Sequence, residues 1–270
     1  DLSWAAGDAQ AKGFLIGATS GRTTLNGEGL QHQDGHSHIL SSTIPNCLSY
    51  DPTYAYEVAT IVKDGIKKMY IDQENYFYYI TTINENYTHP EMPQDCEEGI
   101  IKGMYVLSDN ESYDVRLLGS GAILREALKA KEILFKFKIK AQVWSVTSFN
   151  LLRKDGMEIE RYNQLNPSGK QKLTYVEECF SDSSVPVIAA TDYMRSYAEQ
   201  IRPYIHSSYT TLGTDGYGRS DSRQTLRDFF EVDSRSIARA AIYALYKNDK
   251  IDKNQIDNYY KELGVDSNKP

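Results

Sequence analysis

The feature that most constrains the fold is the alternation of short apolar segments with longer amphipathic ones. Segments rich in β-branched and aromatic residues occur at residues 75–83, 115–119, 141–149, 185–191 and 209–213, and segments with helical periodicity lie at residues 122–134, from about 150, and at 192–205. Strands that alternate with helices of this length form βαβ units, in which helices cover both faces of the sheet. We therefore predict an α/β protein. No internal repeat or heptad pattern indicates a solenoid or a coiled coil.

Capping signals predict two helical regions. Asp51 and Pro52 precede a segment in which apolar residues recur at helical spacing, so we expect a helix that is capped at Asp51 and has proline at its first position. Residues 233–263 are expected to form two helices that pack on the sheet, the first capped by Asp233 or Ser234.

The segment TINENYTHPEMPQDCEEG interrupts the alternation. It contains two prolines and several carboxylates and shows little periodicity, which is typical of a connection between domains. A chain of 270 residues is long enough for two domains of ordinary size. We place the boundary within residues 88–112, and we expect domains at residues 1–95 and 113–270, with a linker at residues 96–112.

Charge and cysteine content disfavour several kinds of partner. The net charge of −7 argues against a nucleic-acid backbone, and no apolar run reaches the roughly 18–20 residues that a membrane span requires. Cys47, Cys96 and Cys179 are odd in number and form no CxxC pair, so neither a disulfide framework nor a zinc ribbon is indicated. We therefore expect a cytoplasmic protein that binds neither nucleic acid nor membrane.

The segment NGEGLQHQDGHSH, residues 26–38, holds the densest group of reactive side chains: His32, His36, His38 and Asp34. Two of the histidine spacings suit metal ligands on a strand or a helix. The glycines of this segment indicate a loop instead, and no HExxH motif or cysteine partner completes a zinc set. A metallohydrolase site remains an alternative, but a structural loop whose histidines bond to the backbone explains the pattern more simply.

Two further glycine-containing segments are ambiguous. Gly119, Ser120 and Gly121 follow a predicted strand and could cradle a dinucleotide, but the third glycine of that motif is absent and tight packing explains the turn more simply. GTDGYGRSDSR, residues 213–223, could bind an anion, contact a subunit or form a self-satisfied surface loop. No GxSxG or Walker motif is present.

Read as continuous text, the chain contains a series of specific blocks. They are SGRTTLNGEGLQHQDGHSHILSSTIPNCLSYDPTYAYEVA, YYITTINENY, LLGSGAILRE, WSVTSFNLLRKDG, ATDYMRSYAEQIRPY and LGTDGYGRSDSRQTLRDFFEVD. In this order they resemble the homodimeric bacterial type of the first component of pyruvate dehydrogenase, a thiamine diphosphate-dependent decarboxylase of the transketolase-like superfamily. The resemblance covers nearly the whole chain and implies that it is the C-terminal third of a longer subunit.

The resemblance implies a fold of two three-layer α/β domains with transketolase-like architecture. The first would be the later part of the middle domain, which binds the thiamine pyrimidine, and the second would be the C-terminal domain. The subunit would form a homodimer, decarboxylate pyruvate with thiamine diphosphate and Mg²⁺, and reductively acetylate lipoyl groups of the dihydrolipoyl acetyltransferase core. A related enzyme with another 2-oxo acid as substrate, or a non-catalytic dimerisation or regulatory domain, is the alternative.

The resemblance also assigns site residues. His32 matches the histidine that reaches the substrate-derived part of the thiamine adduct, so we expect it to be catalytic and substrate-binding. His36, His38 and Asp34 are expected to support the site or the loop. Gln33 departs from the family pattern, in which an acidic residue is frequent. The main cofactor and metal residues are expected upstream of residue 1, so no metal ligand is assigned here and the chain alone is expected to be inactive.

Overall fold

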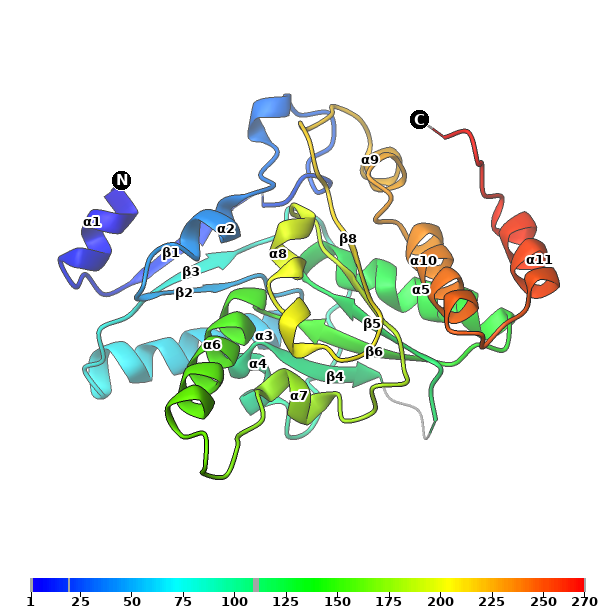
Figure 1. Ribbon diagram of the computed structural model, residues 1–270. Coiled ribbons are helices and arrows are strands. Elements are labelled where there is room, and N and C mark those ends of the chain that lie inside the picture. The colour runs from blue at the N-terminus through cyan, green and yellow to red at the C-terminus, as the bar shows by residue number, and fades with distance from the viewer. Residues whose placement is uncertain (1, 19, 109–111, 270) are drawn as a thin grey trace.

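The computed structural model describes residues 2–18, 20–108 and 112–269, which form two sheets (Figure 1). The first sheet has the order β1-β3-β2 and contains the parallel strands β1 (Phe14–Gly17), β2 (Cys47–Tyr50) and β3 (Phe77–Thr81). The second has the order β4-β6-β5-β7-β8 and contains β4 (Met104–Ser108), β5 (Val115–Gly119), β6 (Ala141–Val146), β7 (Val187–Ala190) and β8 (Tyr209–Leu212). Among the strands of the described residues, β4 is antiparallel to its neighbour, β6, and the other pairs are parallel.

Helices surround both sheets. They are α1 (Leu2–Asp8), α2 (Ser37–Ser41), α3 (Ala55–Ile66), α4 (Glu97–Lys102), α5 (Leu124–Lys136), α6 (Phe149–Leu165), α7 (Tyr175–Cys179), α8 (Arg195–Glu199), α9 (Arg223–Phe229), α10 (Ser234–Lys247) and α11 (Lys253–Leu263). Short 3-10 turns lie at Leu30–His32, Gly121–Ile123 and Arg202–Tyr204, and a π turn extends α3 at Lys67–Ile71. Among the described residues, no helix combines the length and apolar character that a membrane span requires.

The second sheet is the middle layer of three. Successive residues of a strand face opposite sides of its sheet, and in β5 the side chain of Leu117 joins the core beneath α5 and α10, while that of Leu118 joins the core beneath α6 and α8. Figure 1 shows these helix pairs on opposite faces of the sheet. The predicted α/β class and the helical cover on both faces are confirmed.

Several predicted elements coincide with observed ones. The segments at residues 75–83, 115–119 and 209–213 contain β3, β5 and β8, and residues 233–263 form α10 and α11. Asp233 caps α10, since its carboxylate accepts a hydrogen bond from the Ser236 N–H at 2.9 Å. The helix predicted at residues 192–205 is shorter than expected, because it breaks into α8 and the 3-10 turn that contains Pro203.

The predicted start of the first long helix at Asp51 is wrong. Helix α3 begins at Ala55, and the carboxylate of Glu57 accepts hydrogen bonds from the Thr53 and Tyr54 N–H groups at 2.6 and 2.8 Å. Asp51 is fully buried instead of capping the helix. The helix therefore starts where the carboxylate within its own first turn satisfies the free amides.

The segment that led to the expected linker, residues 82–99, is irregular up to residue 96, whereas part of the expected linker at residues 96–112 is regular; residues 109–111 lie outside the described residues. The expected linker contains α4 and β4, and β4 pairs with β6 of the second sheet. Gly103 ends α4 with a φ of 117°, which allows the chain to turn directly into β4. Both elements have only five or six residues, so they leave little periodicity for sequence reasoning to detect.

The two sheets meet where several parallel strands end. The Asp51 N–H, just after β2, donates to the Thr147 carbonyl at 2.7 Å, and the Asp51 carbonyl accepts from the Gly121 N–H at 3.1 Å. The Thr53 hydroxyl donates to the Gly121 carbonyl at 2.6 Å. The glycine turn at residues 119–121 is therefore buried and occupied by protein contacts, which supports its structural interpretation over a dinucleotide site.

Asp51 is a buried carboxyl group at this junction. Its Oδ1 accepts a hydrogen bond from the Thr81 hydroxyl at 2.8 Å, while its Oδ2 has no partner in the protein. Burial raises the pKa of Asp51 to about 7, and the hydrogen bond from Thr81 opposes this shift only in part. The junction therefore contains an acid that ionises near neutral pH.

We predict that Gly121→Ala destabilises the protein by at least about 2 kcal/mol, because a left-handed residue with a side chain is strained. The φ of Gly121 is 47°, and an added Cβ would lie 2.5 Å from the Asp51 carboxylate oxygens. Urea unfolding would measure the loss. Gly169→Ala is the matched control, since its Cβ would meet only ordinary contacts at 3.4 Å or more. Equal stability of the two variants would contradict the prediction.

A second prediction concerns pH. Between about pH 4 and 7 the folded state holds the Asp51 proton more tightly than the unfolded state does, so stability falls as the pH rises through this interval. Asparagine cannot ionise. The unfolding free energy of Asp51→Asn minus that of wild type should therefore be roughly 2–4 kcal/mol larger at pH 8 than at pH 4. The exposed Asp257→Asn is the control. Parallel stability profiles of wild type and Asp51→Asn would refute the assignment.

Candidate functional site

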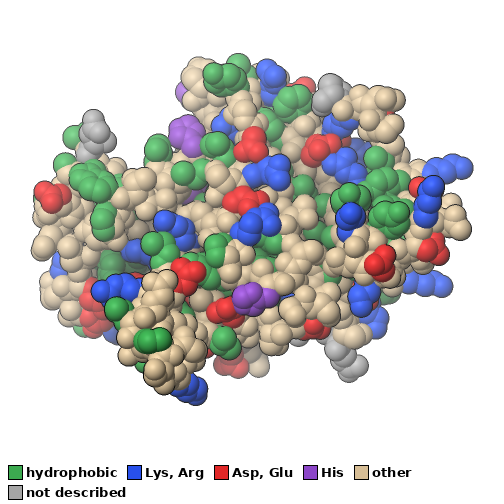
Figure 2. Space-filling model, viewed as in Figure 1, with side chains coloured by type: hydrophobic (Ala, Val, Ile, Leu, Met, Phe, Trp, Pro, Cys, Tyr) green, Lys and Arg blue, Asp and Glu red, His purple; other side chains and the backbone are tan. Residues whose placement is uncertain are grey.

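Residues 26–38, the histidine loop, lie above the strand ends at the junction of the two sheets. The loop contains the 3-10 turn Leu30–His32 and continues into the N-terminus of α2. Figure 1 shows it at the top of the molecule, beside the connection from β8 to α9. In the same view, histidine side chains reach the surface in this region (Figure 2).

The three histidines of the loop differ in exposure. His32 and His36 are exposed, whereas His38 is fully buried. Within residues 2–18, 20–108 and 112–269, no group of three or more His, Cys, Asp or Glu side chains is placed to hold a metal ion. The spacing that suggested shared metal ligands therefore does not bring these side chains together, and the metallohydrolase alternative is not favoured.

His38 packs inside the protein among tyrosines. Its ring stacks on Tyr197 with 4.8 Å between the ring centroids, and it meets the edge of Tyr193 at 4.7 Å. Burial lowers the pKa of His38 to about 3, so the ring is neutral under ordinary conditions. A buried neutral imidazole at this position supports the base of the loop.

The tautomer of His38 follows from its partner. His38 Nε2 lies 3.1 Å from the Thr81 hydroxyl oxygen, whose single proton faces two acceptors, the Tyr50 carbonyl at 3.2 Å and the Asp51 carboxylate at 2.8 Å. When the Thr81 proton goes to one of these two oxygens, His38 Nε2 carries a proton and donates it to the Thr81 hydroxyl. Nδ1 is then an acceptor, and it has no partner in the protein.

Asp34 organises the end of the loop. Its carboxylate accepts hydrogen bonds from the His36 and Ser37 N–H groups, both at 3.0 Å, and from the Ser37 hydroxyl. These amides lie at the start of α2, where N–H groups lack partners within the helix and a negative charge is favourable. The Asp34 carboxylate therefore stabilises the helix start, and its hydrogen bonds are made within the chain.

The histidine loop is attached to residues 213–223. The Gly27 N–H donates to the Asp221 carbonyl at 3.0 Å, and the Asn26 side chain accepts from the Arg223 N–H at the same distance. The segment GTDGYGRSDSR therefore acts as a contact surface for the loop within this chain.

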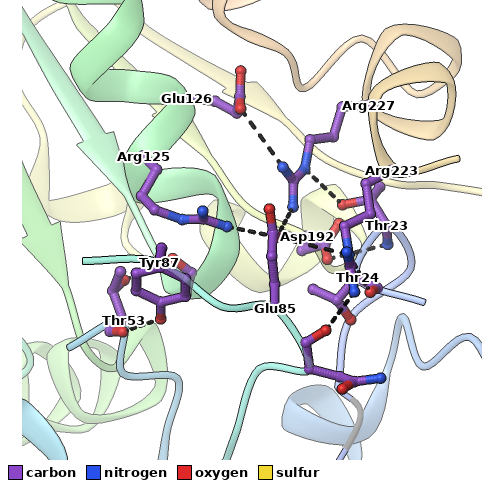
Figure 3. A network of polar contacts seen from close by, with 12 residues as sticks. Thr23, Thr24, Thr53, Glu85, Tyr87, Arg125, Glu126, Asp192, Arg223 and Arg227 are labelled. Atoms are coloured by element: carbon purple, nitrogen blue, oxygen red, sulfur yellow. Dashed lines mark hydrogen bonds and ion pairs between the residues drawn. The ribbon is translucent and has the colours of Figure 1, made fainter. Parts of the chain in front are cut away.

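Sequence reasoning missed a partly buried charge network beside Thr23, just before the loop (Figure 3). Glu85, after β3, forms ion pairs with Arg125 of α5 at 2.5 Å and with Arg227 of α9 at 2.7 Å. Burial alone would raise the pKa of Glu85, but hydrogen bonds and charges from Arg227 and Arg125 outweigh it and lower the pKa to about 2. Arg227 Nε also donates to the Thr23 hydroxyl at 3.2 Å. No local sequence signal identifies these partners, because they are distant in the chain.

Comparison with known sequence families gives two matches. Residues 1–90 match the family described as pyruvate dehydrogenase E1 component middle domain, and residues 103–233 match the transketolase-like TK C-terminal domain. Pyruvate dehydrogenase E1 components from Pseudomonas aeruginosa and Escherichia coli strain K12 are 56% and 54% identical to this chain. Each alignment covers all of this chain and 31% of the relative, so the chain spans about a third of their length.

Solved structures show the same fold at low sequence identity. A transketolase mutant from Pichia stipitis aligns with a TM-score of 0.68 and 17% identity over 93% of this chain and 33% of that one. A split-gene transketolase, an inactive beta4 tetramer, aligns with a TM-score of 0.59 and 18% identity over 86% of this chain and 66% of that one. The fold of the described residues is therefore transketolase-like.

Proposed function

The chain belongs to the pyruvate dehydrogenase E1 component family, and we propose from this that it forms part of a subunit that decarboxylates pyruvate with thiamine diphosphate. The same subunit would reductively acetylate lipoyl groups of the dihydrolipoyl acetyltransferase core. Sequence identity above one half along the entire chain supports this proposal. The activity belongs to the longer subunit, because the chain spans about a third of its relatives.

We assign residues 1–95 to the later part of the thiamine pyrimidine-binding domain and residues 113–270 to the transketolase-like C-terminal domain. The separate three-stranded and five-stranded sheets support this division. The segment between them, which holds α4 and β4, packs with the C-terminal domain through the pairing of β4 with β6.

We propose His32 as the catalytic and substrate-binding residue of this chain. The observation that carries the assignment is the exposure of His32 on a loop in which the next two side chains, Gln33 and Asp34, form hydrogen bonds within the chain. Its imidazole can therefore donate a hydrogen bond to a group outside the chain, for example to the carboxylate or the developing oxyanion of a bound 2-oxo acid. His38 and Asp34 support the loop, and His36 is a weaker candidate for a supporting role.

The described residues do not fit a complete cofactor site. They contain no cluster of three or more His, Cys, Asp or Glu side chains that could hold a metal ion, and we propose that other parts of the subunit hold Mg²⁺ and the diphosphate. Thiamine diphosphate, when bound, supplies the decarboxylation chemistry. The contribution of this chain is a hydrogen-bonding side chain at the substrate end of the site.

We further propose that the subunit acts as a cytoplasmic homodimer on the pyruvate that glycolysis produces. The inactive beta4 tetramer of the split-gene transketolase supports the expectation that a part of this fold can assemble without activity. A related 2-oxo acid is the competing substrate, and relative turnover of several 2-oxo acids would decide between them.

In the full-length subunit, His32→Ala should lower kcat/KM for pyruvate by about 100-fold or more, because a positioned donor or proton-transfer group contributes this much. Steady-state kinetics would measure the loss. Thiamine diphosphate affinity should be unchanged, since the cofactor is held elsewhere. Gln31→Ala, an exposed neighbour in the same turn, is the control and should retain activity. An active His32→Ala variant would exclude the catalytic role.

The 270-residue chain alone should neither bind thiamine diphosphate tightly nor turn over pyruvate, because we expect the main metal and diphosphate ligands in other parts of the subunit, and the described residues hold no cluster of three or more metal-ligating side chains. Calorimetry with thiamine diphosphate and Mg²⁺ would test binding, and carbon dioxide release would test turnover. The full-length subunit serves as the positive control. Measurable turnover by the isolated chain would show that it contains every essential group.

A further inference from the structure

We propose that Gln33 is a positioning residue, whose side-chain amide fixes the histidine loop to residues 218–219 of the second domain and thereby places the His32 imidazole. The inference rests on the proposed catalytic role of His32. It gives the C-terminal domain a specific task in the reaction, namely to hold the substrate-facing loop in position.

Gln33 pairs with a peptide group across the junction. Its Nε2 donates to the Arg219 carbonyl, and its Oε1 accepts from the Arg219 N–H at 2.7 Å. Both bonds are made by a side chain that is only 4% exposed. Glutamine can form this pair because its amide presents a donor and an acceptor together, as a peptide group does.

The approach requires glycine at residue 218. A Cβ built on Gly218 would lie 2.6 Å from Gln33 Oε1 and 2.9 Å from the Leu30 carbonyl. The absence of this atom lets the two segments come close enough for the paired hydrogen bonds. Gly218 and Gln33 therefore form one contact between the two loops.

The contact acts directly on the turn that carries His32. The Gln33 N–H donates to the Leu30 carbonyl at 3.3 Å, and the His32 N–H donates to the Gly29 carbonyl at 3.0 Å. His32 itself is exposed, so buried packing of its own side chain does not fix it. The position of His32 therefore depends on Gln33, the adjacent residue that is anchored. A shift of about 1 Å in a reacting group can lower the rate by two orders of magnitude.

The other hydrogen bonds that attach the loop lie outside the Leu30–His32 turn, so Gln33 is the residue that anchors this turn. Gly27 and Asn26 hold the beginning of the loop to residues 221–223, and the Gly35 carbonyl accepts from the Met194 N–H at 2.9 Å. These bonds lie on either side of the Leu30–His32 turn. Loss of the Gln33 pair should therefore loosen the turn while both ends of the loop stay attached.

The test uses Gln33→Met in the full-length subunit, since methionine has a similar size but cannot form either hydrogen bond. We expect faster amide hydrogen exchange in residues 26–36 and 213–222, and a kcat/KM for pyruvate lowered at least tenfold. Thiamine diphosphate affinity should stay within about twofold of wild type. Gln31→Met is the matched control, with the same substitution two residues away at an exposed position.

Gln33→Glu supplies a second readout. Its ionised carboxylate can accept from the Arg219 N–H but cannot donate to the Arg219 carbonyl, whereas the protonated form can do both. The activity of this variant relative to wild type should therefore recover as the pH falls. A side chain that only filled space would give the same relative activity at every pH.

The outcomes separate the two hypotheses. Unchanged hydrogen exchange in Gln33→Met would overturn the proposed anchoring. Faster exchange with unchanged kcat/KM, while His32→Ala is inactive, would overturn the positioning role. If His32→Ala is itself fully active, the proposed catalytic function fails and the positioning role fails with it, whereas the exchange data still report the loop contact. Circular dichroism of both Gln33 variants would show that they are folded.

Discussion

The contact between strand ends at the junction of the two sheets is the constraint on which the rest of the site depends. Asp51 makes this contact with its backbone, donating to Thr147 and accepting from Gly121. Peptide groups that are buried in this way need partners in the protein, because water cannot reach them. The junction therefore fixes how the two sheets meet, and the histidine loop lies over it.

Hydrogen bonding divides the polar residues of that loop into two groups. His38, Asp34 and Gln33 bond to Thr81, to the start of α2 and to Arg219, so their polar groups serve the fold. His32 remains exposed on the turn between anchored residues. Glu85 pairs with Arg125 and Arg227 beside this segment, and loss of this half-buried carboxylate would remove the ion-pair partner of Arg125, while Arg227 would keep Glu126 at 3.6 Å. An exposed side chain held between anchored residues is the arrangement that a substrate-binding group requires.

Predictions from local pattern succeeded where a segment carries its own signal. Strand β5 coincides with the predicted residues 115–119, and α10 begins after the capping residue Asp233. The start of α3 was misplaced because Glu57, within the helix, accepts the hydrogen bonds of the free amides. Asp51 instead bonds to Gly121 and Thr147, which lie 70 residues or more further along the chain. The elements α4 and β4 were missed because they are too short to show a periodicity, and β4 also depends on its pairing with β6.

By itself, the sequence determined the fold class, the family resemblance and the loop in which the site was expected, because periodicity and motifs are local properties of the chain. The tertiary structure decided which histidine is exposed and which is buried, since that depends on Tyr193 and Tyr197 from a distant segment. It also decided that Gln33 meets Arg219, 186 residues further along the chain. Burial and hydrogen-bond partners of this kind arise only when distant segments pack together, so the spacing of residues could not reveal them.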